Sequence, residues 1–540
     1  MIKKYWPALL FLSILILISY GNSLNNVFLS DDLAEIVNNP NIGNLGYAIS
    51  SRPTGFIRLI LNWMAFGLGG LNPFFFRSIN ILFHAGTVFL IYLLFKRLYS
   101  QRLALFVAGL FAVHPAISEA VVWISGGTYP QYAFFFLLSF LFYILSAKRR
   151  LFYLLSFIFF SLSFMSHPQM PIALFLIFPL FEFSFGPPAG GLKKNWTKTL
   201  PYLALSIAYV LISLSVMPER ETTLQSMHYQ QGGTDNPLIQ IPVALSSYFE
   251  LTIFPKSLTL YHSELAFGAI NFAIRALLTL AFFGAILFAF RKNKFIFFWL
   301  SFFLIALSPT LTPLRMNWIV AERYLYLPIL GLLAIIALGL DKLSHNLKFK
   351  QGIYVFFSIL LIMLSVRTIV RNIDWKNEDN LWIATGKTSP SSPNTHNNLG
   401  DVYGRQGNKL AALAEFQRAI ELKPNYGDAY HNLANTYIEL GQADKALENY
   451  QNALKFNPNL WQSYQNIAAI YFNLKKFDLT IENLTKAAAI NPRNLNIRNN
   501  IGIVYLTAGE KGKAKEIFNL ILSVDPQNPL AKQGLMEANK

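Results

Sequence analysis

Apolar residues form long, nearly continuous runs over the first 370 residues and then give way to a polar, amphipathic pattern. The runs recur from Tyr5 to Val370 and are of the length that crosses a bilayer as a helix, about 20 residues. We therefore predict an all-α protein with a polytopic membrane domain at 1–370 and a polar C-terminal domain. About eleven candidate spans lie at 5–22, 75–95, 103–115, 131–147, 151–166, 169–185, 199–217, 268–290, 294–311, 324–340 and 352–370.

The C-terminal domain repeats with a period of 34 residues, which is the tetratricopeptide period. A proline recurs at that spacing, and small, aromatic and turn-glycine positions keep the same register, with Lys475 in place of one glycine. The period predicts an α-solenoid of four repeats at 393–528 with a capping helix at 529–540, after a connecting segment at 371–392. The prolines are Pro390, Pro424, Pro458, Pro492 and Pro526.

Amide side chains of the first helices in these repeats are candidates for binding a peptide. Paired hydrogen bonds from asparagine and glutamine amides suit an extended peptide backbone, and solenoids commonly use such surfaces for binding. A solvated or self-associating surface is the alternative. The predicted peptide-binding residues are Asn397, Asn432, Asn435, Gln465 and Asn466.

The formal net charge of +17 indicates membrane topology and not a nucleic-acid partner. Residues 1–370 hold 26 Lys and Arg against 12 Asp and Glu, whereas the remainder holds 19 against 16. Basic clusters fall at the N-terminus and in every second loop, as the positive-inside rule predicts for a cytoplasmic N-terminus. The opening apolar run has no small-x-small cleavage site, so we predict an uncleaved span. An odd number of spans then places the repeats outside the cytoplasm.

Two adjacent carboxylates, Asp31 and Asp32, follow the first span on the predicted outer side. Charge beside a bilayer is costly and is usually retained for function. A carboxylate within reach of a hydroxyl can act as its general base, so we predict Asp31 as the base and Asp32 as its orienting neighbour. The alternative is an ordinary helix start with Ser30 as the N-cap.

Several arginines also lie on the predicted outer side, against the positive-inside rule. Guanidinium groups bind phosphate through two hydrogen bonds, so a lipid phosphate is one explanation and ion pairs with nearby carboxylates are the other. His84 lies inside a span and is either a packing residue or a phosphate ligand. Glu119 and His114 lie on one outer turn and either hold a sugar or form structural contacts. The arginines are Arg52, Arg58, Arg77, Arg220, Arg315 and Arg323.

These motifs, in this order and followed by tetratricopeptide repeats, resemble the transmembrane-and-tetratricopeptide-repeat O-mannosyltransferases and their bacterial relatives, which are integral-membrane glycosyltransferases of the C-type fold. Two motifs depart from the family pattern, at Gly127–Gln131 and Ser166–Pro168. The resemblance rests on Asp31-Asp32, Ser51-Arg-Pro53, Asn80–His84, Phe111–Glu119, Val122–Gly126, Phe254–Leu258, Ala321–Pro328, Arg371–Trp375 and Leu381-Trp382.

The resemblance implies transfer of mannose or a similar hexose from a polyprenyl-phosphate donor to a hydroxyl of an extracytoplasmic acceptor, in a bacterial inner (plasma) membrane. The repeats favour a protein acceptor; a lipid or polysaccharide acceptor, a non-catalytic scaffold and a lipid-linked-sugar transporter are the alternatives. We expect no cofactor and no metal, and the absence of cysteine excludes thiolate metal sites. The implied roles are Asp31 and Asp32 in catalysis, Arg323, Tyr324, Arg52 and His84 at the donor phosphate, and Glu119 and His114 at the acceptor or sugar.

Overall fold

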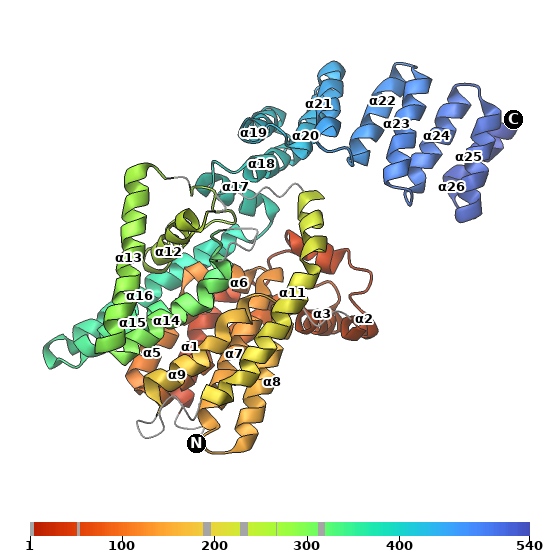
Figure 1. Cartoon of the computed structure of the whole chain (residues 1–540). Coiled ribbons are helices and arrows are strands. Elements are labelled where there is room, and N and C mark those ends of the chain that lie inside the picture. Colours follow the sequence, from red (N-terminus) through yellow and green to blue (C-terminus); the bar gives the residue numbers. More distant parts are fainter. Residues whose placement is uncertain (1–4, 51–54, 187–195, 227–235, 266, 312–318) are drawn as a thin grey trace. The chain divides into compact units, whose positions relative to one another are not determined.

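The chain folds into two compact units, residues 1–388 and 389–540, in a computed structural model (Figure 1). Every element found in the described residues is helical, which agrees with the predicted all-α class. The structure describes all residues except 1–4, 51–54, 187–195, 227–235, 266 and 312–318.

The first unit is a bundle of apolar helices joined by short turns and by longer loops that carry polar residues. Short 3-10 and π-helical turns in the loops are introduced below where they matter. The helices are α1 (Trp6–Tyr20), α2 (Leu45–Ser50), α3 (Phe56–Gly69), α4 (Pro73–Leu98), α5 (Gln101–Val113), α6 (Ser118–Val122), α7 (Thr128–Leu145), α8 (Arg150–Ser166), α9 (Ile177–Phe185), α11 (Leu200–Ser226), α12 (Pro237–Ile253), α13 (Ala269–Lys292), α14 (Lys294–Leu307), α15 (Ile329–Ser344), α16 (Leu347–Asp374) and α17 (Glu378–Thr388).

Each predicted span lies on one or more of these helices, but the structure does not confirm eleven crossings. Within the described residues, five helices are long and apolar enough to cross a membrane, and a sixth is added if the bent pair 101–113 and 115–122 is one span. Five others contain 10–17 residues. Because an α-helix rises about 1.5 Å per residue, four of these helices fall below the ~30 Å of a hydrocarbon core. The fifth stretch covers the first part of α11, which continues to Ser226.

Aromatic side chains fill the interior of the first unit. Phe178 of α9 packs on Tyr202 of α11, with ring centroids 4.2 Å apart, and Phe95 of α4 stacks on Trp299 of α14 at 4.6 Å. Contacts of this kind add about 0.5–1.5 kcal/mol per pair beyond the buried area. They join helices that are distant in sequence into one core, on which the outer loops are built.

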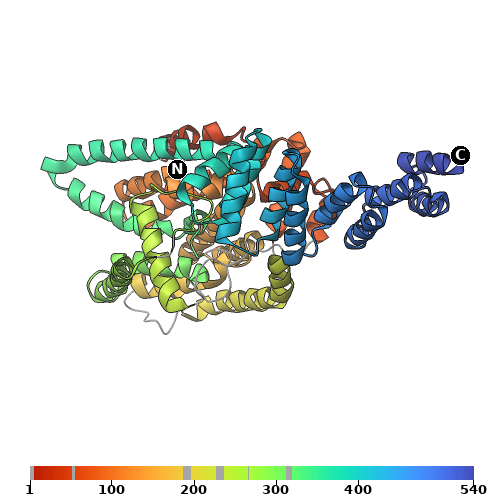
Figure 2. The same cartoon turned by 90° about the horizontal axis from the view of Figure 1, so that it is seen from above.

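The segment 371–392 is not the separate connector that the sequence predicted. Helix α16 continues to Asp374, α15 and α16 form a long hairpin (Figure 2), and α17 follows directly. Trp375 and Leu381 are buried in the core of the first unit, so this unit ends at Thr388. Apolar residues in 371–388 decide the boundary, because their burial needs the first unit's helices.

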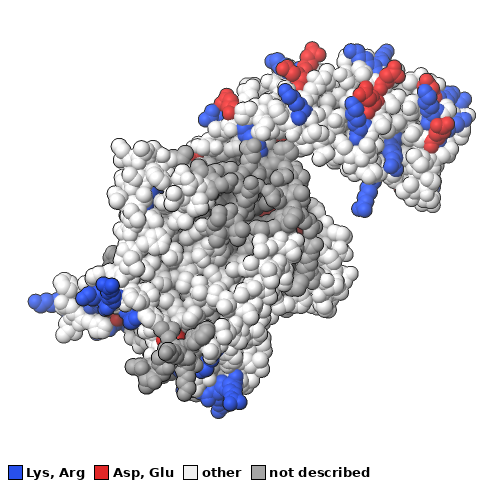
Figure 3. Space-filling model, viewed as in Figure 1, with Lys and Arg blue, Asp and Glu red and all other residues white. Residues whose placement is uncertain are grey.

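The visible surfaces of the two units differ in charge. Charged side chains are sparse on the visible face of the first unit and lie mainly at its edge, where they are mostly basic (Figure 3). On the repeats, basic and acidic side chains are interspersed (Figure 3). A mostly uncharged helical surface is what lipid contact requires, because a charge in hydrocarbon is costly, whereas mixed charges suit a surface in water.

The second unit is a stack of helical hairpins in the register that the 34-residue period predicts. The last helix, α26, packs against α25 and α24 as the predicted cap. The helices are α18 (Pro393–Arg405), α19 (Lys409–Leu422), α20 (Gly427–Glu439), α21 (Ala443–Phe456), α22 (Trp461–Asn473), α23 (Phe477–Ile490), α24 (Leu495–Thr507), α25 (Lys511–Val524) and α26 (Pro529–Asn539).

The turn inside each hairpin requires a left-handed backbone. Gly407, Gly441 and Gly509 have φ of 78°, 74° and 83°, and Lys475 at the equivalent position has φ of 56°. A residue with a Cβ atom is strained in the left-handed region, whereas glycine is not. The repeat geometry therefore overrides the local preference of Lys475.

We expect Lys475→Gly to stabilise the third hairpin by about 0.5–1 kcal/mol, because the relief of strain exceeds the added flexibility of the unfolded chain. Hydrogen exchange of the α22 and α23 amides in the full-length protein measures the effect, and slower exchange is expected. The matched control, Gly441→Lys, should speed exchange in α20 and α21. Faster exchange in Lys475→Gly would contradict the strain argument.

Candidate functional site

The two adjacent aspartates after the first span occupy different environments. Asp32 is fully buried, whereas Asp31 is exposed. The Ser125 backbone N–H and hydroxyl donate to Asp32 Oδ1 at 2.8 and 2.6 Å, and the Leu29 N–H donates to Oδ2 at 3.1 Å. Burial raises the pKa of Asp32 to about 6, although the bonds from Ser125 and Leu29 oppose the shift. Asp31 is thus the carboxylate that is open to solvent, and Asp32 holds the loop in place.

The helix that starts here does not use Ser30 as its N-cap. Ser30 has φ of 53°, in the left-handed region, whereas an N-cap residue is normally extended. The following π-helix, η3 (Leu33–Val37), has no side-chain cap. Instead, Asp32 accepts from the Leu29 N–H three residues earlier. The alternative of an ordinary Ser-capped helix start is therefore wrong.

Arg77 of α4 ties this loop to the segment after α6. Asn72 caps the helix and Pro73 begins it, so α4 starts at a defined position and presents Arg77 on its second turn. The fully buried guanidinium donates to Val122 O at 2.7 Å, to Asn26 O at 2.6 Å and to Leu24 and Val27 O at 3.3 and 3.2 Å. These carbonyl contacts replace the phosphate contact considered from the sequence.

Asn80, three residues later on the same face of α4, extends this attachment. Its amide donates to Trp123 O at 3.1 Å and Ile124 O at 3.2 Å. Residues three apart share a helix face, so Arg77 and Asn80 together hold residues 122–124. Ser125, which anchors Asp32, follows directly and lies on η5 (Ser125–Gly127).

A second carboxylate shares Ser125 with Asp32. The Ser125 hydroxyl lies 3.1 Å from Glu35 Oε2, and Arg58 of α3 donates to both Glu35 oxygens at 2.8 and 2.6 Å. Arg58 and Glu35 are each about one-third exposed. Arg58 is therefore one of the outer arginines whose partner is a carboxylate, and it helps hold η3 in place.

Arg323 pairs with Glu119, the ion-pair alternative considered from the sequence. Its Nη1 donates to Glu119 Oε1 at 2.6 Å and its backbone N–H to Oε2 at 3.0 Å. Arg323 lies on η9 (Glu322–Leu325), and its guanidinium faces the rings of Trp123 and Tyr324, 5.6 and 5.2 Å from their centroids. Burial alone would lower the pKa of Arg323, but Glu119 raises it well above its usual value. A permanent cation therefore sits beside Trp123.

Glu322, next in sequence to Arg323, faces a different arginine. Arg371 at the end of α16 donates to Glu322 Oε1 and Oε2 at 3.2 and 3.3 Å and to Asp374 at 3.0 Å. The Thr259 N–H also donates to Glu322. Sequence reasoning assigned no role to Arg371, although it begins one of the motifs shared with the resembled family. Its full burial with two acids marks it as a structural centre of the outer loops.

Two predicted histidine ligands lie in the interior with their ring nitrogens bonded to protein. His84 contacts Tyr326 Oη at 2.8 Å and Ala112 O at 3.1 Å. His114 contacts Thr252 O at 3.0 Å and accepts from the Ala116 N–H at 3.3 Å. The structure thus gives packing and capping roles to these side chains, and neither a phosphate nor a sugar ligand follows from it. Arg52 lies outside the described residues.

The predicted peptide-binding amides of the repeats bond to one another. The Asn432 amide donates to Asn397 at 3.0 Å, and Asn466 donates to Asn435 at 3.0 Å and to Tyr450 at 3.0 Å. Gln465 and Asn466 line a groove of about 260 Å³ that Asn473, Asn500 and Phe472 also line. Four of the amides thus form two hydrogen-bonded pairs, and Gln465 and Asn466 border a hollow. Peptide binding stays a prediction.

Comparisons with known proteins agree with this division of the chain. Residues 57–217 match the family model described as dolichyl-phosphate-mannose-protein mannosyltransferase. Tetratricopeptide-repeat models match 393–426, 415–448, 434–475 and 471–536. Among solved structures, the crystal structure of MamA is 21% identical and covers 28% of this chain and 82% of its own, at a TM-score of 0.25 that supports no detailed comparison.

Curated relatives match about three quarters of the chain. Human protein O-mannosyl-transferase TMTC1 is 25% identical and the match covers 75% of this chain and 54% of the relative. Mouse TMTC3 is 25% identical over 70% of this chain and 45% of its own, and Caenorhabditis elegans F38B6.6 is 25% identical over 77% and 63%. The chain spans about half the length of the curated relatives that it matches. With a mannosyltransferase-type region followed by tetratricopeptide repeats, the chain is similar to these protein O-mannosyl-transferases over most of its length.

Proposed function

We propose that this protein is an integral-membrane glycosyltransferase that moves mannose or a similar hexose from a polyprenyl phosphate to a hydroxyl of an extracytoplasmic acceptor. The observation that supports it best is the exposed Asp31 beside the buried, triply bonded Asp32. This pair lies in a chain whose residues 57–217 match a mannosyltransferase family model. No cofactor or metal has a part in the proposal.

In the proposed reaction, Asp31 takes the proton of the acceptor hydroxyl as its oxygen attacks the anomeric carbon. The bond between that carbon and the phosphate oxygen breaks, and polyprenyl phosphate leaves with the bonding electron pair. A positioned base of this kind contributes about 10²–10⁴-fold. Asp32 keeps Asp31 in place through Ser125.

Arg323 is the proposed cation for the leaving phosphate, with Tyr324 next to it. A fixed positive charge in a site that excludes water stabilises charge that develops in the transition state. The segment 119–125 contacts both the acidic pair and the arginine, since Ser125 binds Asp32 and Glu119 binds Arg323. These contacts support a single site in which Asp31 and Arg323 act together. We assign Glu119 to the positioning of Arg323.

The direct test is transfer of a labelled sugar from a polyprenyl-phosphate donor, in sealed vesicles that contain the full-length protein. We expect lipid-dependent incorporation into added acceptor on the extracytoplasmic side, and mannosyl phosphate donors are the first to try. Free nucleotide sugars are the control and should not support transfer. Failure with every lipid-linked donor would contradict a glycosyltransferase and favour the scaffold alternative.

The acceptor is proposed to be Ser or Thr of a protein held by the repeats. Removal of 393–540 cuts after the first unit, so we expect the truncated protein to keep transfer to short peptides. Transfer to a protein acceptor should fall about tenfold, corresponding to roughly 1.4 kcal/mol of lost binding. Comparison of the two acceptors in the vesicle assay measures this. If transfer to both acceptors fell equally, or if neither fell, the repeats would have no part in acceptor choice. A lipid or polysaccharide acceptor would then be favoured.

The proposed location is a bacterial inner membrane, with the N-terminus in the cytoplasm and the repeats outside. Basic clusters at the N-terminus and in alternate loops support this orientation. The clusters include Lys3-Lys4, Lys148-Arg149-Arg150 and Arg291-Lys292. In this orientation Asp31, Arg323 and the repeats all face the extracytoplasmic side.

A further inference from the structure

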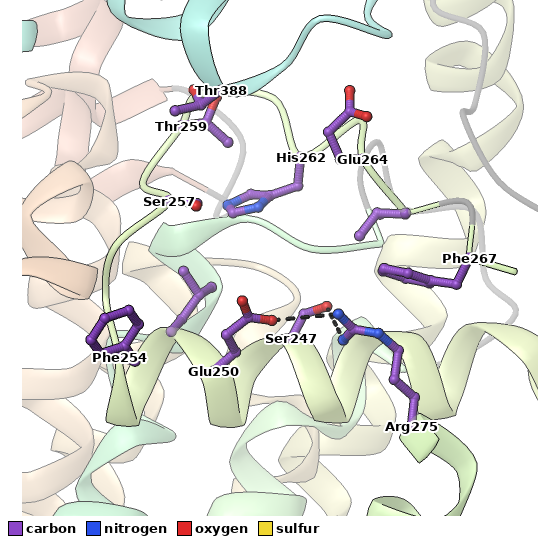
Figure 4. A pocket seen from close by; sticks show the side chains of 12 residues that line it. Ser247, Glu250, Phe254, Ser257, Thr259, His262, Glu264, Phe267, Arg275 and Thr388 are labelled. Atoms are coloured by element: carbon purple, nitrogen blue, oxygen red, sulfur yellow. Dashed lines mark hydrogen bonds and ion pairs between the residues drawn. The ribbon is translucent and has the colours of Figure 1, made fainter. Parts of the chain in front are cut away.

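A pocket separate from the Asp31 site opens between α12, α13 and the loop that joins them (Figure 4). Its volume is about 270 Å³. None of Asp31, Asp32 and Arg323 lines it. The lining is polar at its centre, with Ser247, Glu250, Ser257, Thr259, His262, Glu264 and Arg275, and is bordered by Leu251, Phe254, Leu265, Phe267 and Thr388.

The charges in this pocket disfavour a phosphate. Arg275, the one cation among the described lining residues, donates to Ser246 Oγ at 2.8 Å and pairs with Glu250 at 3.4 Å, and Figure 4 draws the pair with Glu250 as a dashed line. Phe267 covers the guanidinium at 3.8 Å. Glu264 adds a second carboxylate to the lining. An anion would therefore meet two carboxylates and an arginine that is already paired.

His262 adds an imidazole ring to the lining of the pocket. Its Nε2 has no hydrogen-bond partner within the described part of the chain, and Glu322 Oε1 lies 3.9 Å away, beyond hydrogen-bond reach. Burial, helped by Arg371 and Arg323, lowers the pKa of His262 to about 3, so the ring is neutral. Its ring lies among the lining side chains (Figure 4).

We propose that this pocket binds a neutral carbohydrate, as a sugar site additional to the site of transfer. Sugar hydroxyls both donate and accept, and so match carboxylates, serine hydroxyls and a neutral imidazole together. Phe254 and Phe267 supply apolar surface for the ring faces. The volume is slightly below the range of about 300–1,000 Å³ for drug-sized ligands, which suits a single sugar. The sugar is either free or already attached to an acceptor.

The proposal does not depend on Asp31 as a base. Thr259 connects the two regions, because its side chain lines the pocket and its N–H donates to Glu322, the neighbour of Arg323. An occupied pocket would therefore lie next to the machinery proposed for transfer without being part of it.

The test is binding of methyl α-D-mannopyranoside and of a mannosylated serine peptide to the full-length protein in detergent, by saturation-transfer NMR and calorimetry. The Asp31→Asn background prevents turnover. Ser257→Phe fills the pocket, and the matched control Lys256→Phe lies on the same loop, is exposed and does not line the pocket. We expect Ser257→Phe to weaken binding by about tenfold or more, or about 1.4 kcal/mol, and Lys256→Phe to leave it unchanged. The tighter of the two probes identifies the source of the sugar.

A second arm tests the charge argument. Mannose 6-phosphate should bind more weakly than the neutral glycoside, and His262→Phe should also weaken the neutral glycoside. Equal binding to wild type and Ser257→Phe would overturn the proposal, as would binding only of the unmannosylated peptide. A folded Ser257→Phe protein, checked by its thermal transition, is required for the comparison, and His262→Phe tests the same pocket independently. If the protein bound the glycoside in this pocket but transferred no sugar, the proposed enzymatic function would be rejected and the proposed sugar pocket would stand.

Discussion

Asp31→Asn should abolish sugar transfer while leaving the protein folded. Loss of a general base lowers rates by about 10²–10⁴-fold, and Asp31 is exposed, so its replacement by an isosteric amide breaks no contact of the described interior. Initial rates of lipid-linked sugar transfer in vesicles measure the effect. Thermal unfolding in detergent, monitored in parallel, should be unchanged.

Asp32→Asn is the informative comparison for Asp31→Asn. The amide keeps only one oxygen, so it cannot accept from Ser125 and Leu29 as the carboxylate does. We expect this variant to lose both stability and activity, whereas Asp31→Asn loses activity alone. If Asp31→Asn transferred sugar at the full rate, Asp31 could not be the general base. If Asp32→Asn kept its stability, the anchoring role of Asp32 would be wrong.

Arg77→Ala should produce the largest loss of stability in the outer region. It removes a buried donor group from the carbonyls of Leu24, Asn26, Val27 and Val122. Buried acceptors left without partners cost about 1–3 kcal/mol each, so we expect the free energy of unfolding to fall by roughly 3 kcal/mol or more. Transfer should fall with it, because the loop that carries Asp31 loses its attachment to residues 122–125.

Arg77→Lys separates geometry from charge. An ammonium group is a compact donor and cannot reproduce the fork of a guanidinium, so we expect only partial rescue of both stability and transfer. Thermal unfolding and hydrogen exchange of residues 24–32 in the full-length protein are the measurements. The control is Arg58→Ala, whose partly exposed pair with Glu35 contributes about 0–1 kcal/mol. Equal losses in Arg77→Ala and Arg58→Ala would contradict the role of Arg77.

The repeat domain was predictable because its signal is local and periodic. The positive φ of Gly407, Gly441 and Gly509 follows from a turn that recurs every 34 residues. Lys475 takes the same left-handed backbone as these glycines. The repeat geometry therefore sets the turn conformation even where the residue is not glycine. The membrane half was predictable as apolar helices for a similar reason. The number of crossings stays a prediction, because helices such as α8 are shorter than the hydrocarbon core of a bilayer.

The partners of the charged residues could not be predicted from the sequence. Asp31 and Asp32 are equal in sequence, yet one is exposed and the other is buried against Ser125, 93 positions away. Arg323 has Glu322 beside it and binds Glu119 instead, while Glu322 binds Arg371. Neighbours in a chain point in different directions along a helical turn, so adjacency does not predict contact.

Local patterns of apolar, small and turn residues were sufficient to predict the helices, the repeats and an acidic pair directly after the first apolar helix, because each depends on spacing within one segment. The roles within that pair depended on tertiary structure. Arg77, Asn80 and Ser125 hold the first loop against residues 122–125, so Asp32 becomes the buried anchor and Asp31 the accessible carboxylate. Such contacts join residues 43 to 93 positions apart, and only burial in the assembled core makes them favourable.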